Sequence, residues 1–362
     1  MVVFFILLLV PMAMQHIVIG SADINYEKKN RRALTVFFVL LTILVACRHE
    51  SVGNDTRNYV HFFERFSAMS WGEVGQDSLE YGYAYFNKVV SLFSKEPQFF
   101  LVVAAIAVSA MIYPTYKRLC LDPTLSIVLF CTISTFVMSF SGIRQMLAIG
   151  LGFIAYDLTR KRKLLPFVLV VCSAVLFHTS AFILIFMYPL YHAKITKKWL
   201  YIVVPVIAIV FLFNRQIFSV LSVIIERYTR FTGGVSSTGA YTMLFLFGLF
   251  TVFSFVVPGD SKLDQETIGL RNFLLFSLVL QMFTPLHVLA MRMNYYYIIF
   301  IPLLLPKIIA CRNERWSQVA ILGRHVMVVF FLAYFLINVY TTAGTSSCLH
   351  VFPYHFFWEN IA

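Results

Sequence analysis

The stretch FFLVVAAIAVSAMIYPTY occupies residues 99–116 and contains no charged side chain. It is almost long enough to cross a bilayer as an α-helix, because a spanning helix needs about 20 apolar residues. Similar apolar stretches recur along the chain and are separated by clusters of Lys and Arg. Their length favours helices over the roughly ten-residue alternating strands of a membrane β-barrel. We therefore expect lipid to be the solvent of this chain.

The composition supports the same interpretation. Hydrophobic residues make up 60% of the 362 positions, charged residues make up 13%, and the mean hydropathy is +0.80. Soluble domains carry about 25% charged residues. The formal net charge of +12 would suggest a nucleic-acid partner for a soluble domain, but here the basic residues only separate apolar runs. In lipid, backbone polar groups must be satisfied within their own element, which again favours helices.

About twelve apolar runs can be bracketed, and most reach spanning length once interfacial residues are added. These runs are residues 1–19, 33–47, 99–116, 124–140, 143–159, 164–177, 179–191, 199–213, 241–257, 269–289, 294–310 and 325–341. The first run has no basic start, so we interpret it as a retained helix rather than a signal peptide. The prediction is an all-α polytopic membrane protein, a single integral membrane domain over residues 1–362 with about twelve transmembrane helices.

Two longer segments separate these runs. Residues 48–98 form a large loop between the second and third expected helices, and residues 214–240 form a second one. The first loop is rich in Tyr, Phe and Trp, which suits interfacial helices that lie on the membrane. The same rings would also suit stacking against sugar faces.

The positions of Lys and Arg predict the orientation, because cytoplasmic loops are enriched in these residues. Basic clusters at 28–32 and 160–163 fall on one side of the alternating spans. The segments 48–98 and 214–240 fall on the other side, where basic residues are sparser. We expect those two loops to face away from the cytoplasm.

Residues 164–193 are either one long helix or a hairpin of two short helices. The hairpin keeps the later basic clusters on the cytoplasmic side, so we favour it. Its tip, Phe177-His178-Thr179-Ser180, would be recessed in the membrane. Non-helical backbone at that depth is tolerated only where it lines protein or a water-filled cavity.

Arginines gather on the outward side of this topology. They are Arg48, Arg57, Arg144, Arg227, Arg230 and Arg292, with His287 close to the last of them. A guanidinium group matches phosphate oxygens with two parallel hydrogen bonds, and Arg144 also opens a helix, where the dipole favours an anion. The cluster predicts a site for a lipid-linked pyrophosphate, whereas single arginines could equally reach lipid headgroups.

Two side chains are candidates for a general base. His178 stands at the expected hairpin tip, and an imidazole titrates close to neutral pH, as a general base should. Asp55 lies beside Arg57, whose charge would hold it ionised, although an Asp in this loop could simply cap it. The residues alone leave both open.

Several common motifs are missing from the sequence. It contains no GxGxxG, no Walker loop and no Asp-x-Asp, and its six cysteines are scattered without metal-ligand spacing. We therefore expect no cofactor and no metal. A glycosyl donor would then be linked to lipid rather than to a nucleotide.

Three segments of the chain resemble the EpsG/Wzy-like family of bacterial polysaccharide repeat-unit polymerases. They are Arg48 to Tyr59, which is similar to an Arg–Gly–x–Asp–x–x–x–Tyr pattern, Gly142 to Gln145, and Phe177 to Ala181. Asn54 departs from the Thr that is common in the first pattern.

The resemblance implies a glycosyltransferase that joins undecaprenyl-pyrophosphate-linked oligosaccharides at the periplasmic face of a bacterial inner membrane. The product would be O-antigen (and so lipopolysaccharide), capsule or exopolysaccharide, and a chain-length regulator protein is an implied partner. Arg144 would stabilise the leaving pyrophosphate, and His178 or Asp55 would deprotonate the acceptor hydroxyl with inversion of the anomeric centre. The implied substrate-binding residues are Arg48, Arg57, Tyr59, Gln145, Arg227, Arg230, His287 and Arg292.

Two other classes of protein remain open. A flippase for lipid-linked oligosaccharide would usually carry ionisable residues at mid-membrane, and none falls in the middle of an expected span. The other is a membrane acyltransferase or a ligase that transfers finished polymer to a lipid. A ligase would share the arginine-rich outer side, so the sequence separates it poorly from a polymerase.

Overall fold

The computed structural model describes residues 2–15, 26–133, 135–224, 237–259, 263–343, 345 and 347–361. Within these ranges the chain is helical, and its only extended pairings are two isolated bridges. It divides into two compact units, which are described separately. Unit 1 is Met1–Phe182 with His325–Ala362, and unit 2 is Ile183–Arg324.

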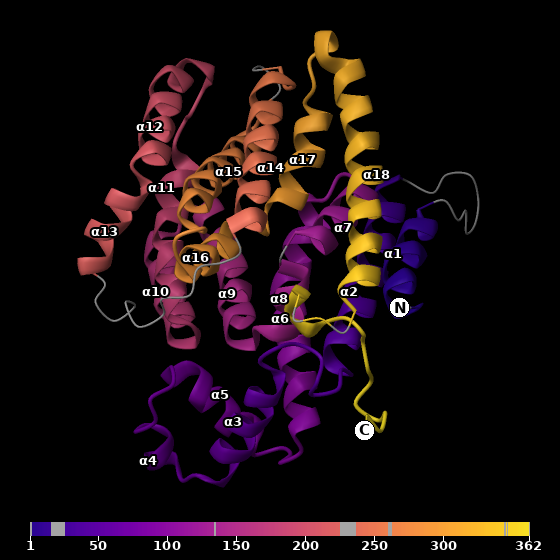
Figure 1. Ribbon diagram of the computed structural model, residues 1–362, viewed down its shortest axis with the longest axis vertical. Helices are drawn as coiled ribbons and strands as arrows, with labels where there is room; N and C mark the ends of the chain where they lie inside the picture. Colours follow the sequence, from indigo (N-terminus) through magenta and orange to yellow (C-terminus); the bar gives the residue numbers. More distant parts are fainter. Residues whose placement is uncertain are drawn as a thin grey trace. The chain divides into compact units, whose positions relative to one another are not determined.

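Unit 1 contains ten complete helices in the described ranges (Figure 1). They are α1 (Val2–Met14), α2 (Tyr26–Ala46), α3 (Thr56–Ala68), α4 (Trp71–Val74), α5 (Tyr81–Val90), α6 (Pro97–Leu119), α7 (Pro123–Thr132), α8 (Thr135–Ser141), α9 (Ile143–Arg160) and α10 (Leu164–Phe177). The C-terminal part of α18 (Ser317–Thr341) also belongs to this unit. Unit 1 therefore holds both the chain's N-terminal helices and its C-terminal segment.

Unit 2 contains the helices that follow the expected hairpin tip. They are α11 (Met187–His192), α12 (Leu200–Leu212), α13 (Asn214–Ile224), α14 (Ser237–Val256), α15 (Gln265–Phe283), α16 (Val288–Ile298) and α17 (Ile301–Ala310). Its core includes a chain of aromatic rings in which Phe273 meets Tyr297 and Phe300. The Tyr297 hydroxyl donates to the Ile183 carbonyl at 2.8 Å, so the ring's polar end is satisfied within the core.

Every apolar run bracketed in the sequence contains helix in the described residues, although the run 124–140 is divided between α7 and α8 and the run 269–289 extends past the end of α15. The helical class is therefore confirmed. Among the described residues, three helical segments could cross a membrane by length and composition: Pro97–Leu119, Gly239–Val256 and Glu314–Thr341. The number rises to six if three bent helix pairs each count as one span. Helices such as α10, with 14 residues, reach only about 21 Å of the roughly 30 Å hydrocarbon core. The count of twelve spans stays a prediction.

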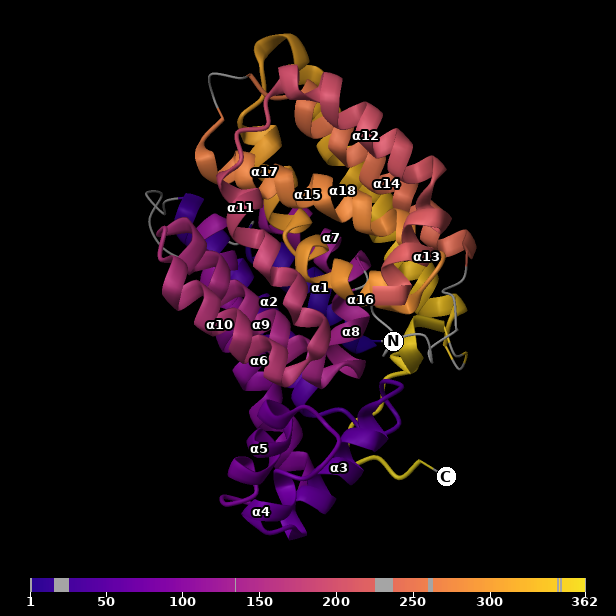
Figure 2. The same ribbon diagram turned by 90° about the vertical axis from the view of Figure 1, so that its left-hand side faces the viewer.

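The 48–98 loop folds into three helices, α3, α4 and α5. They lie together at one end of α6, α9 and α10 (Figures 1 and 2). Tyr59, Phe63 and Tyr83 are buried here with Phe100 of α6, and the rings of Phe63 and Phe100 stack with their centroids 5.0 Å apart. This packing fixes the loop against the helix bundle of unit 1. Whether its helices also lie at a membrane interface stays a prediction.

The C-terminal segment of unit 1 packs against the start of the same loop. The backbone N–H groups of His49 and Asn54 donate to the carbonyls of His355 and Leu349 at 2.9 and 3.0 Å. The Tyr354 hydroxyl donates to the Leu44 carbonyl at 2.9 Å. The C-terminal segment, about 300 positions further along the chain, therefore holds the turn after α2 in place.

Candidate active site

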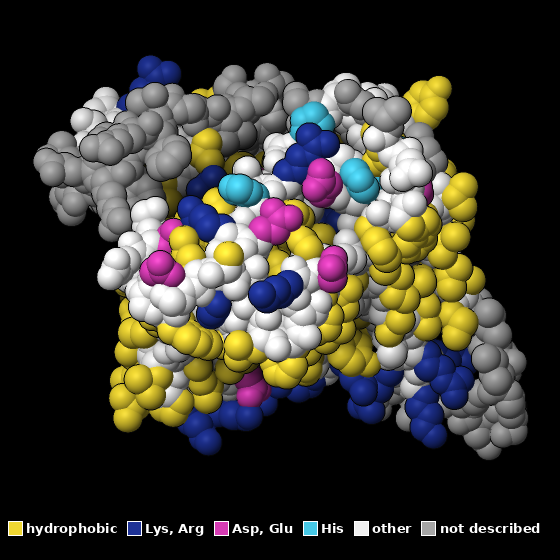
Figure 3. Space-filling view, turned by 90° about the horizontal axis from the view of Figure 1, so that it is seen from below, with side chains coloured by type: hydrophobic (Ala, Val, Ile, Leu, Met, Phe, Trp, Pro, Cys, Tyr) yellow, Lys and Arg dark blue, Asp and Glu magenta, His cyan; other side chains and the backbone are white. Residues whose placement is uncertain are grey.

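The candidate site lies at the α3–α5 end of unit 1 and is centred on Glu80. Seen from that end, charged side chains of both signs and histidines gather in the middle of the face, with hydrophobic side chains along its borders (Figure 3). Glu80 is the N-cap residue of α5, but its carboxylate makes no capping hydrogen bond to that helix. Both carboxylate oxygens instead reach residues of other segments.

One oxygen of Glu80 binds Arg144. The Arg144 Nη1 group donates to Oε2 of Glu80 at 2.6 Å, and both side chains are largely buried, with 24% and 17% exposed. Arg144 is the second residue of α9, which begins after the non-helical Gly142. A charge-assisted contact of this kind is about twice as strong as a neutral hydrogen bond. The helix start therefore delivers the guanidinium to the loop carboxylate.

The other oxygen of Glu80 binds His178. Nδ1 of the imidazole lies 3.3 Å from Oε1 of Glu80, and the Thr179 hydroxyl donates to the same oxygen at 3.4 Å. His178 has an extended backbone (φ −156°, ψ 121°) and ends α10. The helix thus breaks at the residue expected to form the hairpin tip, and this break directs the imidazole toward the loop.

The charge of Glu80 indicates which nitrogen of the His178 imidazole carries the shared proton. Burial raises the pKa of this carboxyl, but the hydrogen bond from His178 and the charge of Arg144 outweigh it and lower the pKa to about 2. An ionised carboxylate can only accept hydrogen bonds, so Nδ1 of His178 must carry the proton that it shares with Glu80. A neutral imidazole then has its lone pair on Nε2, where a general base needs it.

Gly82 allows α5 to approach the end of α10. A Cβ atom at this position would lie 2.8 Å from the Leu176 carbonyl oxygen and 2.9 Å from its Cβ. Any larger residue would therefore push α5 away from α10. Because Glu80 precedes Gly82 by two residues and His178 follows Leu176 by two, this close approach sets the carboxylate–imidazole distance.

Two tyrosines complete the surroundings of Arg144. Burial raises the pKa of Tyr59, so its phenol is neutral, and its oxygen accepts a hydrogen bond from Arg144. The Arg144 guanidinium carbon lies 5.8 Å from the centre of the Tyr83 ring, within range of a cation–π interaction. Nε of Arg144 is buried and has no hydrogen-bond partner among the described residues. Arg144 is thus held firmly while keeping one donor unused.

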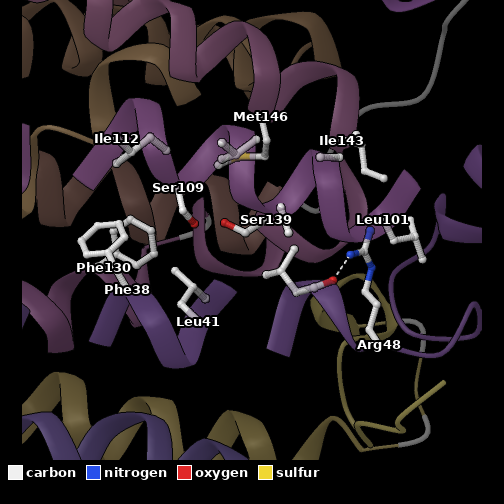
Figure 4. A pocket seen from close by; sticks show the side chains of 14 residues that line it. Phe38, Leu41, Arg48, Leu101, Ser109, Ile112, Phe130, Ser139, Ile143 and Met146 are labelled. Carbon is white, nitrogen blue, oxygen red and sulfur yellow. Dashed lines mark hydrogen bonds between the residues drawn. The ribbon is translucent and has the colours of Figure 1, made fainter. Parts of the chain in front are cut away.

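The structure separates the other site residues predicted in unit 1. Arg57 is exposed and pairs with Glu50 at 3.5 Å. Asp55 is the N-cap residue of α3, and its backbone N–H donates to the Ser141 hydroxyl at 3.4 Å, three residues before Arg144. Gln145 is buried in α9. Arg48 is fully buried, lines a small apolar cavity (Figure 4), and lies within electrostatic range of Tyr59, the tyrosine that accepts from Arg144.

The remaining predicted residues belong to other parts of the chain. His287 lies in unit 2, where it caps α16 by accepting from the Leu289 N–H at 3.0 Å and stacks on Phe218. Arg292 is exposed on α16. Arg227 and Arg230 lie outside the described residues.

Glu80 is the central residue that the sequence did not single out. It stands in a loop that also contains Glu64, Glu73, Asp77 and Glu96, and nothing in its immediate neighbours marks it. Its role depends on partners 64 and 98 positions away. Only its place directly before the aromatic helix Tyr81–Val90 could have drawn attention to it.

The fold and the site together define a helical membrane protein with a buried Glu–His–Arg cluster at the end of its bundle. The chain belongs to the EpsG family, whose sequence model matches residues 31–356. The resemblance seen in three short segments is therefore confirmed over most of the chain, and it points to a function of the polysaccharide-polymerase type. Searches of curated proteins and of solved structures returned no match.

Proposed function

We propose that this protein is a glycosyltransferase that polymerises oligosaccharide units carried on undecaprenyl pyrophosphate, at the periplasmic face of a bacterial inner membrane. The observation that supports this most is the bridge that Glu80 makes between Arg144 and His178. It places a candidate base and a candidate phosphate ligand on one carboxylate, in a family whose function is of this type.

The proposed reaction is a direct displacement. His178 Nε2 takes the proton of an acceptor sugar hydroxyl, and the oxygen attacks the anomeric carbon of the donor unit. The bond from that carbon to the pyrophosphate oxygen breaks, and its electron pair leaves with the pyrophosphate. The Arg144 guanidinium stabilises the negative charge that develops on the leaving pyrophosphate, and the anomeric configuration inverts. Asp55 is the alternative base.

The arrangement of unit 1 supports the outward orientation. The first turns of helix α2 contain the basic cluster 28–32, and α9 ends at Arg160, the first residue of the basic cluster 160–163. The opposite ends of these two helices lead to Arg48 and Arg144. If the basic clusters are cytoplasmic, as is usual for Lys-rich and Arg-rich loops, the Glu80 cluster faces the other side.

The test is a reconstituted assay with purified full-length protein and purified lipid-linked repeat units. We expect His178→Ala to abolish long chains, because general-base catalysis contributes about 10²–10⁴-fold. His61→Ala is the matched control, since His61 lies in the same loop but is 77% exposed. A normal distribution of polysaccharide chain lengths from the His178→Ala variant would refute the assignment of His178 as the base.

Deletion of the gene in cells separates this function from its alternatives. Loss of a polymerase leaves the surface lipid carrying a single repeat unit. Loss of a flippase leaves no repeat unit at the surface, and loss of a ligase leaves finished polymer on its carrier. Either of the last two outcomes would overturn the proposed polymerase activity.

A further inference from the structure

Three large aromatic side chains of α4 and α5 in unit 1 are exposed, and we call them the aromatic patch. Trp71, Tyr81 and Tyr85 are 47%, 55% and 38% exposed, whereas Tyr83, between the two tyrosines, is buried. Tyr81 and Tyr85 stand one helical turn apart on the same face of α5, a rise of about 6 Å. Grouped apolar surface of this kind usually marks a site of interaction.

The rings of Trp71 and Tyr85 lie parallel and leave part of each face uncovered. Their planes differ by 16°, and their centroids are 6.2 Å apart. Parallel rings that overlapped fully would lie at the contact distance of carbon atoms, about 3.5–4 Å. The two rings are therefore offset, as aromatic pairs prefer. Each ring thus keeps electron-rich surface that can meet the C–H groups of a ligand.

Short-range contacts hold this pair in place. Trp71 begins α4, which is stabilised by a capping box between Ser70 and Glu73. The Ser70 N–H donates to the Glu73 carboxylate at 2.6 Å, and the Glu73 N–H donates to the Ser70 hydroxyl at 3.4 Å. At the other end of α4, a Cβ atom on Gly75 would lie 2.9 Å from the Tyr85 hydroxyl oxygen, so α5 packs closely on α4 here. The pair is therefore ordered before any ligand binds.

The aromatic patch is continuous with the candidate active site. Tyr81 directly follows Glu80, whose carboxylate binds Arg144 and His178. Between the patch residues, the chain also exposes the polar side chains of Gln76 and Ser78. Sites for small ligands typically combine aromatic surface with a few polar groups of this kind. A chain molecule with one end at Glu80 could therefore lie across these rings.

The charge of this segment favours a sugar over a membrane surface. Residues 70–80 contain Glu73, Asp77 and Glu80 and no Lys or Arg. Helices that bind anionic lipid headgroups are usually rich in Lys and Arg, which α4 and its flanks lack. Helix α4 also lies farther than α5 from the ends of α9 and α10 (Figures 1 and 2). An uncharged pyranose ring meets no repulsion from these carboxylates.

We propose that the aromatic patch binds the oligosaccharide part of the substrate by stacking against the C–H faces of its pyranose rings. The sugar that reacts would lie at the Glu80 cluster, and the sugars beyond it would lie along Tyr81, Tyr85 and Trp71. The inference rests on the proposed function for the role of this oligosaccharide in chain extension, but not for its binding.

The first test measures binding of a lipid-free oligosaccharide to the full-length protein in nanodiscs by calorimetry. The probe is a fragment of two repeat units, cut from the purified surface polysaccharide of the bacterium that carries the gene. The variants are Trp71→Ala, Tyr85→Ala and the conservative Trp71→Phe. The matched control is Phe93→Ala, which removes a ring of the same loop that is 78% exposed and lies outside the patch. Thermal unfolding shows whether each variant is folded.

We expect Trp71→Ala and Tyr85→Ala each to weaken binding about tenfold, because each removes a ring that stacks on a sugar. Trp71→Phe keeps an aromatic face, so it should weaken binding less than Trp71→Ala does. Phe93→Ala should bind as the unchanged protein does. Unchanged binding by folded Trp71→Ala and Tyr85→Ala variants would overturn the proposal.

The second test asks whether Trp71 contacts lipid instead. The other three tryptophans, Trp199, Trp316 and Trp358, are replaced by Phe so that the fluorescence comes from Trp71 alone. We expect little quenching by lipids that carry a spin label at the headgroup, and a change in emission when the oligosaccharide is added. Strong quenching by the labelled lipid, with no response to the oligosaccharide, would identify a membrane contact and overturn the proposal.

No sugar transfer occurs in either test, so their outcomes are separate from that of the polymerase assay. Normal chain lengths from His178→Ala together with weakened binding by Trp71→Ala would reject the catalytic assignment and keep the sugar site. Lost polymerisation in His178→Ala with unaltered binding by Trp71→Ala and Tyr85→Ala would do the reverse.

Discussion

The two buried arginines of unit 1 differ in their partners. Arg144 has a carboxylate at 2.6 Å, a tyrosine hydroxyl and an aromatic ring around it. Arg48 has a backbone carbonyl and a threonine hydroxyl, and one of its amino groups has no partner. A paired arginine can position other side chains before any substrate binds. The charge of a buried arginine without a counter-charge is neutralised only when an anion from outside the chain binds to it. Arg144 is therefore neutralised by Glu80 within the fold, whereas no carboxylate of the described residues neutralises Arg48.

The largest expected effect is on catalysis. Glu80→Gln keeps the shape of the side chain but removes the charge that fixes the His178 tautomer and pairs with Arg144. We expect the rate of chain extension to fall about a hundredfold, with the binding of the lipid substrates largely retained. The measurement is a single-turnover extension rate with saturating lipid-linked repeat units. Glu64→Gln, an exposed carboxylate of the same loop, is the control.

Equal rates for Glu80→Gln and Glu64→Gln would show that Glu80 serves only the fold. The Glu80 bridge would then be a structural ion pair, and Asp55 would become the stronger candidate for the base.

The second prediction compares how substitution of each arginine changes the free energy of unfolding. Arg144→Met leaves the Glu80 carboxylate buried without its cation, which should lower the free energy of unfolding by about 2–3 kcal/mol. Arg48→Met removes a buried charge that has no counter-charge, so stability should stay the same or rise. Thermal unfolding of both variants in the same detergent, without added lipid, checks this contrast. Equal destabilisation by the two substitutions would contradict it.

The sequence predicted the helical class and the positions of its apolar helices because the pattern of 18-residue apolar runs is local information. It also selected Arg144 and His178, since each stands at the end of a long apolar run beside a helix-breaking turn. It could not find Glu80, whose partners lie far away in the chain. For the same reason the contact of the C-terminal segment with the Arg48 turn was not predicted.

The structure also distinguishes Arg48 from Arg57. In the sequence, Arg48 and Arg57 are equivalent members of an outward cluster. In the fold, one is fully buried at the end of an apolar cavity, and the other is exposed and paired with Glu50. Burial depends on the packing of α2, α6 and the C-terminal segment, which no local pattern encodes.

A smaller effect is expected at Gly82, which tests the distance within the cluster rather than its chemistry. Gly82→Ala adds one methyl group against the Leu176 backbone and should move Glu80 away from His178. We expect a loss of activity of about tenfold, because small misplacements of catalytic groups reduce rates strongly. Gly72→Ala is the control, since its Cβ would meet no atom within 4 Å. Identical activities of the two variants would show that the α5–α10 approach does not set the catalytic geometry.

The smallest expected effect is on the stability of the protein at low pH. The pKa of Glu80 is about 2 in the folded protein and ordinarily 4.5, so folding favours its ionised form. The stability that this confers is complete above about pH 4.5 and is lost as the pH falls toward 2. Other carboxylates titrate in the same range, so the informative quantity is the difference in unfolding temperature between the unchanged protein and Glu80→Gln. That difference should shrink steadily as the pH is lowered through this window. A difference that stays constant would mean that Glu80 is not held ionised by Arg144 and His178, and the comparison between a paired and an unpaired arginine would lose its basis.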